Sequence, residues 1–153
     1  MNRLEHKLPP PVVALFVAFM MWGVARFAGP ISIAFGVRLV AALGMASAGL
    51  AIAIAGIVQF RRARTTTNPF HPDAASSLVH DGIYRFTRNP MYLGMLLILL
   101  GWAAFLASPM ALVLTPLFVL YMNRFQIGPE ERALSARFGA AFDAYTASVR
   151  RWL

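Results

Sequence analysis

The sequence predicts an all-α, polytopic membrane protein with about four transmembrane helices and a C-terminal amphipathic helix in the cytosol. Of its 153 residues, 59% are hydrophobic and 13% are charged, whereas an average soluble domain is about half apolar and about a quarter charged. The apolar residues gather in runs long enough to cross a bilayer as helices. The basic residues gather between alternate runs, as in membrane proteins of fixed orientation.

The first two helices are expected at residues 10–27 and 34–60. Prolines precede the first run, where a missing N–H costs little, and Trp22 and Arg26 suit its interfacial end. A signal peptide is the alternative, but no convincing small-residue cleavage site follows the run. The second run carries Gly44, Gly49 and Gly56, and small residues at such spacing let helices pack closely in lipid.

The third and fourth helices are expected at residues 90–107 and 109–126, joined by a tight turn at Ser108. Pro116 is expected to kink the fourth helix because proline removes a backbone donor. A loop at residues 61–89 separates the second helix from the third. The last segment, 130–149, has apolar residues at three- and four-residue spacing, which predicts an amphipathic helix.

The distribution of charge predicts the orientation. Four helices place both termini and the 61–89 loop on one side, and these parts carry twelve of the 14 Lys and Arg residues. Only Arg26 and Arg38 flank the opposite side. This positive-inside bias predicts cytoplasmic termini. Compactness and an Ala- and Arg-rich composition favour a bacterial inner membrane. The arginines therefore mark topology, and no nucleic-acid partner is predicted.

The segment His80–Leu97 places several polar groups directly before the third helix. Gly82 suits a tight turn, and Asn89 precedes Pro90, the expected first residue of the helix. The amide groups of a helix N-terminus attract anions, and Arg88 adds a planar fork of donors. The alternative is that Arg85 and Arg88 are anchors that contact lipid phosphates.

The segment Ile127–Leu134 carries two adjacent carboxylates, Glu130 and Glu131, just beyond the fourth helix. They are suited to a cationic group such as an ammonium or a sulfonium. The alternative is helix capping, with Glu131 paired to Arg132 or Arg137. No metal site is predicted, because the chain has no cysteine and His71 and His80 lack a third ligand at useful spacing.

The two polar segments, in this order, resemble the integral-membrane methyltransferases of the isoprenylcysteine carboxyl methyltransferase family and the related phospholipid methyltransferases. The resemblance runs from Gln59 to the C-terminus. The matching residues are Leu78-Val79, Gly82, Tyr84, Arg88-Asn89-Pro90, Tyr92, Gly94, Glu130-Glu131, Leu134, Phe138-Gly139, Phe142, Tyr145 and Arg150 or Arg151. Asn89 stands where the prenylcysteine enzymes have His, and Phe142 stands where a Tyr is usual.

The resemblance implies a single methyltransferase domain over residues 1–153 that uses S-adenosylmethionine at the cytosolic membrane face. The acceptor would be lipophilic, either an isoprenylcysteine-like carboxylate or a lipid headgroup. Three sets of residues are implied. The cofactor would contact Leu78, Val79, Gly82, Tyr84, Arg88, Asn89, Tyr92, Glu130 and Glu131; the catalytic residues would be Arg88, Asn89 and Glu131; the acceptor would meet Arg124, Tyr145 and Arg150.

Two other functions remain open on the sequence. Sterol-type membrane reductases have a similar patch of Arg, Tyr and Gly and bind NADPH, but the paired glutamates suit a cation better than a polyphosphate. A non-enzymatic membrane scaffold would use the arginines as anchors only, and it would bind no soluble cofactor.

Overall fold

The computed structural model describes residues 8–63 and 77–153, and within these ranges the regular structure is entirely helical. The long helices are α1 (Pro10–Ala28), α2 (Phe35–Arg62) and α3 (Pro90–Leu106). The remaining elements are η2 (Gly82–Arg85), α4 (Pro109–Leu112), α5 (Leu114–Met122), η3 (Asn123–Ile127), α6 (Gly128–Phe138) and α7 (Ala140–Ser148).

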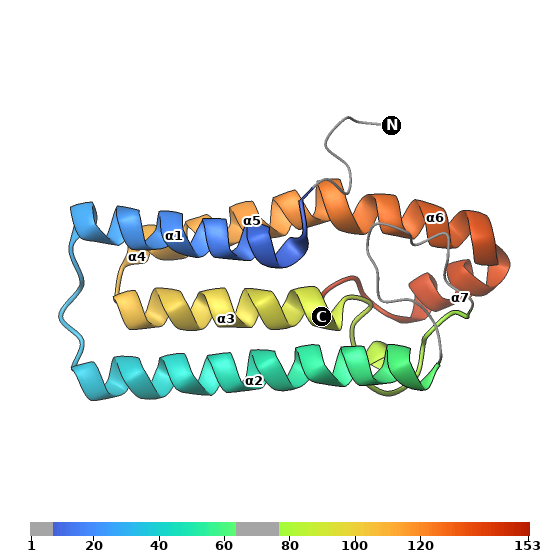
Figure 1. Cartoon of the computed structure of the whole chain (residues 1–153), viewed down its shortest axis with the longest axis horizontal. Coiled ribbons are helices and arrows are strands. Elements are labelled where there is room, and N and C mark those ends of the chain that lie inside the picture. Colours follow the sequence, from blue (N-terminus) through green and yellow to red (C-terminus); the bar gives the residue numbers. More distant parts are fainter. Residues whose placement is uncertain (1–7, 64–76) are drawn as a thin grey trace.

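Helix α3 lies at the centre of the bundle (Figure 1). It packs against α1 and α5 on one side and against α2 on the other, while α4 and α5 also contact α1. The bundle has two distinct ends in this view. We call the end where α3 begins and where α6 and α7 lie the polar end. We call the end where α1 leads into α2 and α3 leads into α4 the far end.

Small residues bring α2 and α3 into direct backbone contact. A Cβ atom added to Gly94 would lie 2.4 Å from the carbonyl oxygen of Gly49, and one added to Gly49 would lie 2.5 Å from that of Gly94. Gly56 packs in the same way on Pro90 at the first turn of α3. The expected packing role is therefore seen for Gly49 and Gly56, but Gly44 has no such neighbour within 4 Å.

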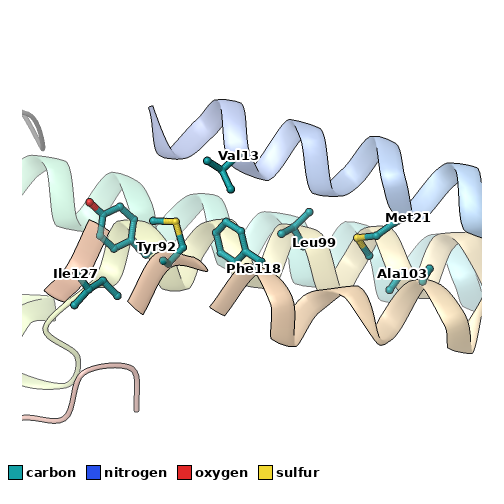
Figure 2. Packing of buried hydrophobic residues seen from close by; sticks show 9 residues of the cluster. Val13, Met21, Tyr92, Leu99, Ala103, Phe118 and Ile127 are labelled. Atoms are coloured by element: carbon teal, nitrogen blue, oxygen red, sulfur yellow. The ribbon is translucent and has the colours of Figure 1, made fainter. Parts of the chain in front are cut away.

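The buried core fills the space between α1, α3 and α5 (Figure 2). Met21, Phe118, Met122 and Ile127 are fully buried in it. Tyr92, near the start of α3, belongs to the same cluster. The core therefore extends to the polar end and gives the side chains there a rigid base.

Near Pro116, which was expected to kink the fourth helix, the α-helix is interrupted at Val113, where α4 ends and α5 begins. Proline at 116 cannot donate to the carbonyl four residues before it, which belongs to Leu112. The hydroxyl of Thr115 donates to that carbonyl instead, at 2.8 Å. The side chain thus satisfies the acceptor that the proline leaves without its backbone donor.

The C-terminal region differs from the single helix expected at 130–149. A π-helical turn, η3, connects α5 to α6 without a break, and α6 ends at Phe138. Gly139 has φ 49° and ψ −127°, a conformation that side chains with a Cβ rarely adopt. The chain reverses there, and α7 folds back toward the bundle (Figure 1).

Three continuous helical stretches, Pro10–Ala28, Phe35–Arg62 and Pro109–Phe138, are long and apolar enough to cross a membrane, and α3 is a shorter apolar helix. In the third stretch the apolar part ends near Met122, because its five charged residues all lie from position 124 onward. Large apolar side chains such as Leu15, Phe16 and Val40 are exposed on the bundle surface. The chain is an all-α polytopic membrane protein, with α6 and α7 beyond the apolar segments.

Candidate functional site

A small cavity lies at the polar end, where the last turn of α2, the start of α3 and helices α6 and α7 converge. Nine residues expected from the sequence line it: Leu78, Val79, Tyr84, Arg88, Asn89, Tyr92, Glu130, Glu131 and Tyr145. The site prediction did not include five other lining residues: Phe60, Ser77, Met91, Leu134 and Phe142. Leu134 and Phe142 belong to the matching motif, so only the other three had no sequence signal.

The cavity encloses about 100 Å³, less than the roughly 300–1,000 Å³ of typical ligand sites. A wider hollow of about 610 Å³ adjoins it and shares Leu78 and Tyr145 as walls. His80, Arg85 and Ser148 also line this hollow. A ligand that reaches the inner cavity therefore has room for its remaining atoms on the outer side of Tyr145.

Arg88 is fixed immediately before α3. Its backbone N–H donates to the carbonyl of Arg150 at 3.0 Å, and one terminal nitrogen lies 3.0 Å from Oε1 of Glu131. The other terminal nitrogen donates to the carbonyl of Thr146 at 3.3 Å. Its Nε is buried and has no hydrogen-bond partner in the described part of the chain. Since a buried N–H is normally paired, this atom is available to a ligand.

Glu131 joins Arg88 to the end of the chain. Its Oε2 lies 2.5 Å from Nη2 of Arg151, and its Oε1 accepts from Nε of Arg151 at 3.1 Å. One carboxylate thus lies between two guanidinium groups. Such charge-assisted, bidentate pairing fixes geometry strongly. Sequence spacing suggested Arg132 or Arg137 as partners, and the structure pairs Glu131 with Arg88 and Arg151 from other segments.

Asn89 contacts the segment that follows α7, which contains Arg150 and Arg151. Its Nδ2 donates to the carbonyl of Arg151 at 2.9 Å. Asn89 is the N-cap residue of α3, but its side chain makes no capping bond to the first helical amides. The Asn89 side chain therefore fixes the segment after α7. The positive end of the α3 dipole stays without a side-chain cap.

Glu130 lies in a different environment from its neighbour. Its Oε1 accepts a hydrogen bond from the hydroxyl of Tyr92. Removal from water raises the pKa of the Glu130 carboxyl to about 7, against the opposing effect of the Tyr92 hydrogen bond, and the nearby Glu131 charge adds to the rise. A carboxyl with a pKa near neutrality can bind a cation or exchange a proton at physiological pH.

Aromatic rings form much of the wall. The rings of Phe60 and Tyr84 meet edge to face with centroids 5.3 Å apart, and the hydroxyl of Tyr145 donates to the carbonyl of Tyr84 at 2.8 Å. The hydroxyl of Tyr84 is buried without a partner among the described residues. Burial raises the pKa of Tyr84 above its usual range and that of Tyr145 to about 12. Both phenols therefore stay neutral.

Three expected site residues lie outside the cavity. Gly82 has φ 61°, and a Cβ there would meet Nε2 of Gln59 at 1.8 Å, so its place in the motif reflects a turn packed on α2. Arg124 is exposed on η3. Arg150 is exposed and contributes its backbone carbonyl to Arg88.

No group of three potential metal ligands comes together in residues 8–63 and 77–153. His80 is exposed, with Nδ1 3.5 Å from the carboxylate of Asp81. His71 lies outside the described residues. The cavity instead combines one arginine, two carboxylates of unequal character and several rings.

The model of the phospholipid methyltransferase family matches residues 37–141, well over half of the chain. The chain belongs to this family. The matched span of the phospholipid methyltransferase model runs from the start of α2 into α7, so it includes Arg88, Asn89, Glu130 and Glu131 and ends before Tyr145. This confirms the resemblance found in the motifs, and it identifies the protein as a membrane methyltransferase.

An uncharacterised protein of Haemophilus influenzae is 44% identical over 63 residues, which cover 41% of this chain and all of that protein. No solved structure matches the chain. The family assignment therefore rests on the sequence, and the geometry of the cavity is an independent observation.

Proposed function

We propose that this phospholipid methyltransferase family protein uses S-adenosylmethionine to methylate a lipophilic acceptor at the cytosolic membrane face. The observation that carries the proposal is that polar groups without partners lie together in one aromatic cavity. Nε of Arg88 and the hydroxyl of Tyr84 lack partners among the described residues, and Glu130 accepts a hydrogen bond from Tyr92.

These groups fit the methyl donor by charge. When bound, S-adenosylmethionine supplies an electrophilic methyl group on a positively charged sulfur. Arg88 and the uncapped start of α3 suit its carboxylate, and Glu130 suits its ammonium. The faces of Tyr84, Tyr92 and the other rings attract a cation, so they suit its sulfonium.

The neighbouring residues hold this arrangement. Glu131 and Asn89 were predicted as catalytic. Through the contacts described above, they keep Arg88 and the segment after α7 in fixed positions. Leu78 and Val79 form apolar walls that exclude water. Methyl transfer is a displacement that gains most from alignment and a dry site, and these residues provide both.

The acceptor is proposed to approach from the bilayer, as a lipid headgroup or an isoprenylcysteine-like carboxylate. Tyr145 lines both the inner cavity and the outer hollow, so it lies where the two substrates would meet. Arg124 and Arg150 are exposed near the same end and are proposed to orient an anionic part of the acceptor. Glu130 is placed to receive a proton if the methylated atom is an amine nitrogen.

The test is titration calorimetry of S-adenosylmethionine and S-adenosylhomocysteine on detergent-purified protein. We expect micromolar binding to wild type and a loss of about tenfold or more in Arg88→Ala and Glu130→Ala, since each removes a charge-assisted contact. Asp143→Asn is the matched control, because Asp143 is exposed on α7 and does not line the cavity.

Three outcomes would contradict the proposal. Binding of NADPH in place of S-adenosylmethionine would favour a reductase. Wild-type protein that binds neither compound, with thermal unfolding unchanged in Glu130→Ala, would favour a scaffold role. Equal losses in Asp143→Asn and Glu130→Ala would show a general charge effect.

A further inference from the structure

A second cavity lies at the far end of the bundle, away from the candidate site. It encloses about 380 Å³, within the range of ligand sites. It is formed where the 29–34 link, the start of α2, the end of α3 and helix α4 meet, and its walls are apolar apart from Arg38 and Ser108. Ile33, Met45, Leu100 and Leu112 are among the apolar residues that line it.

Arg38 is held rigidly in this cavity. Its Nε donates to the carbonyl of Phe105 at 2.7 Å, and its Nη2 donates to the same oxygen. Its guanidinium carbon lies 5.6 Å from the centre of the Phe105 ring. A guanidinium group has five N–H donors. In the described part of the chain, only its Nε and Nη2 donate hydrogen bonds, which leaves the donors of Nη1 for a ligand.

No ion pair is formed by Arg38 within residues 8–63 and 77–153. The six acidic residues of the chain are Glu5, Asp73, Asp81, Glu130, Glu131 and Asp143. None therefore belongs to α1, α2, α3, α4 or α5. An unpaired charge beside apolar surface is costly, so a bound anion would stabilise this end of the bundle.

We infer that the far-end cavity binds a membrane phospholipid, with its phosphate on Arg38 and the upper part of an acyl chain along the apolar walls. A preorganised guanidinium binds phosphate oxygens bidentately, and a phospholipid carries both the anion and the apolar chain that the cavity requires. This lipid would pack between the start of α2 and the end of α3. The inference does not rest on the proposed methyl transfer, which concerns the opposite end.

Arg26 provides an internal comparison. It also lies at the far end, but its guanidinium stacks over the ring of Trp22, 5.5 Å from the centroid. It does not line the cavity. Arg26 thus has the geometry of an ordinary interfacial anchor, and its removal should leave the lipid site intact.

The test is native mass spectrometry of the full chain in detergent, titrated with dioleoyl phosphatidylglycerol. We expect wild type and Arg26→Gln each to retain one lipid at this site, in addition to any lipid that binds elsewhere. Arg38→Gln should retain it about tenfold more weakly, because a charge-assisted contact is lost. Ala104→Phe, which fills the cavity and keeps Arg38, should weaken retention similarly.

Arg38→Gln also removes the hydrogen bonds that Arg38 donates to the Phe105 carbonyl, so it changes a structural contact. Ala104→Phe tests the cavity while it keeps these hydrogen bonds. Equal weakening in Arg26→Gln and Arg38→Gln would reduce the effect to non-specific attraction and overturn the inference. Retention in Ala104→Phe equal to that of wild type would also overturn it, because the lipid would then lie outside the cavity. Dioleoylglycerol, which lacks the phosphate, should not be retained at this site.

Discussion

At the scale of single residues, two adjacent glutamates have different surroundings and therefore different chemistry. Glu131 lies between Arg88 and Arg151, so its charge is matched within the protein. Glu130 points to Tyr92 instead, and its pKa is raised to about 7. Glu130 therefore has the capacity to respond to a bound cation or a proton.

This difference predicts a pH dependence of methyl-donor binding. A pKa near 7 means that the carboxylate fraction of Glu130 rises from about a tenth at about pH 6 to about three quarters at about pH 7.5. The carboxylate binds a cation and the neutral acid does not. The affinity for S-adenosylmethionine, measured by calorimetry, should therefore rise several-fold over this range.

Glu130→Gln removes the titrating group and should give weak binding that is nearly independent of pH in the same range. Asp143→Asn should keep the wild-type profile, because Asp143 is exposed. A wild-type affinity that falls with rising pH would contradict the assignment of the cation contact to Glu130.

At the scale of secondary structure, the contact between α2 and α3 depends on two glycines that face each other. Gly94 belongs to the motif that resembles the family, and the structure gives it a packing role. Gly49 and Gly94 bring the two backbones closer than any side chain would allow. Because α2 packs chiefly on α3 and η2, this contact fixes the wall of the cavity that Phe60 provides.

A Cβ at position 94 should therefore separate the helices. The added carbon would lie 2.4 Å from a backbone oxygen, which cannot move aside as a flexible side chain would. We expect Gly94→Ala to lower the free energy of unfolding by about 1–3 kcal/mol, measured by thermal unfolding in detergent with tryptophan fluorescence as the probe.

Gly44→Ala is the control for this change. It lies on the same helix as Gly49, and a Cβ there meets nothing within 4 Å. Its stability should equal that of wild type or exceed it slightly, since alanine favours helix. Equal destabilisation by both changes would show that helix propensity, and not the close contact, is responsible.

At the scale of the whole molecule, the bundle separates two chemically different ends. The polar end gathers Glu130, Glu131, Arg88 and the segment that follows α7, whereas the far end carries Arg26 and Arg38 beside apolar surface. The positive-inside rule predicts that the polar end lies in the cytosol. This orientation is a prediction that labelling can test.

The absence of cysteine from the chain permits single-cysteine labelling without background. Ser32→Cys, in the link between α1 and α2, should react with a membrane-impermeant maleimide added outside intact bacterial spheroplasts. Ala147→Cys, on α7, should react only after the membrane is permeabilised. Both positions are exposed in the protein, so a reversed pattern would show the opposite orientation.

The sequence by itself determined the fold class. The length of an apolar run is a local property that decides whether a helix spans the bilayer, and the distribution of charge favours one orientation. It also determined the family and nine of the residues that line the cavity. The start of α3 at Pro90 followed from local backbone chemistry in the same way.

Only the tertiary structure decided how these residues are used. Sequence spacing suggested Arg132 or Arg137 for Glu131 and gave no indication of Arg88 and Arg151, which the structure brings to it from other segments. The reversal at Gly139 returns α7 and Tyr145 to the cavity, where a continuous helix would have carried them away. Phe60 lies in the site because α2 packs on α3. Such pairings depend on contacts between distant segments, and no local pattern encodes them.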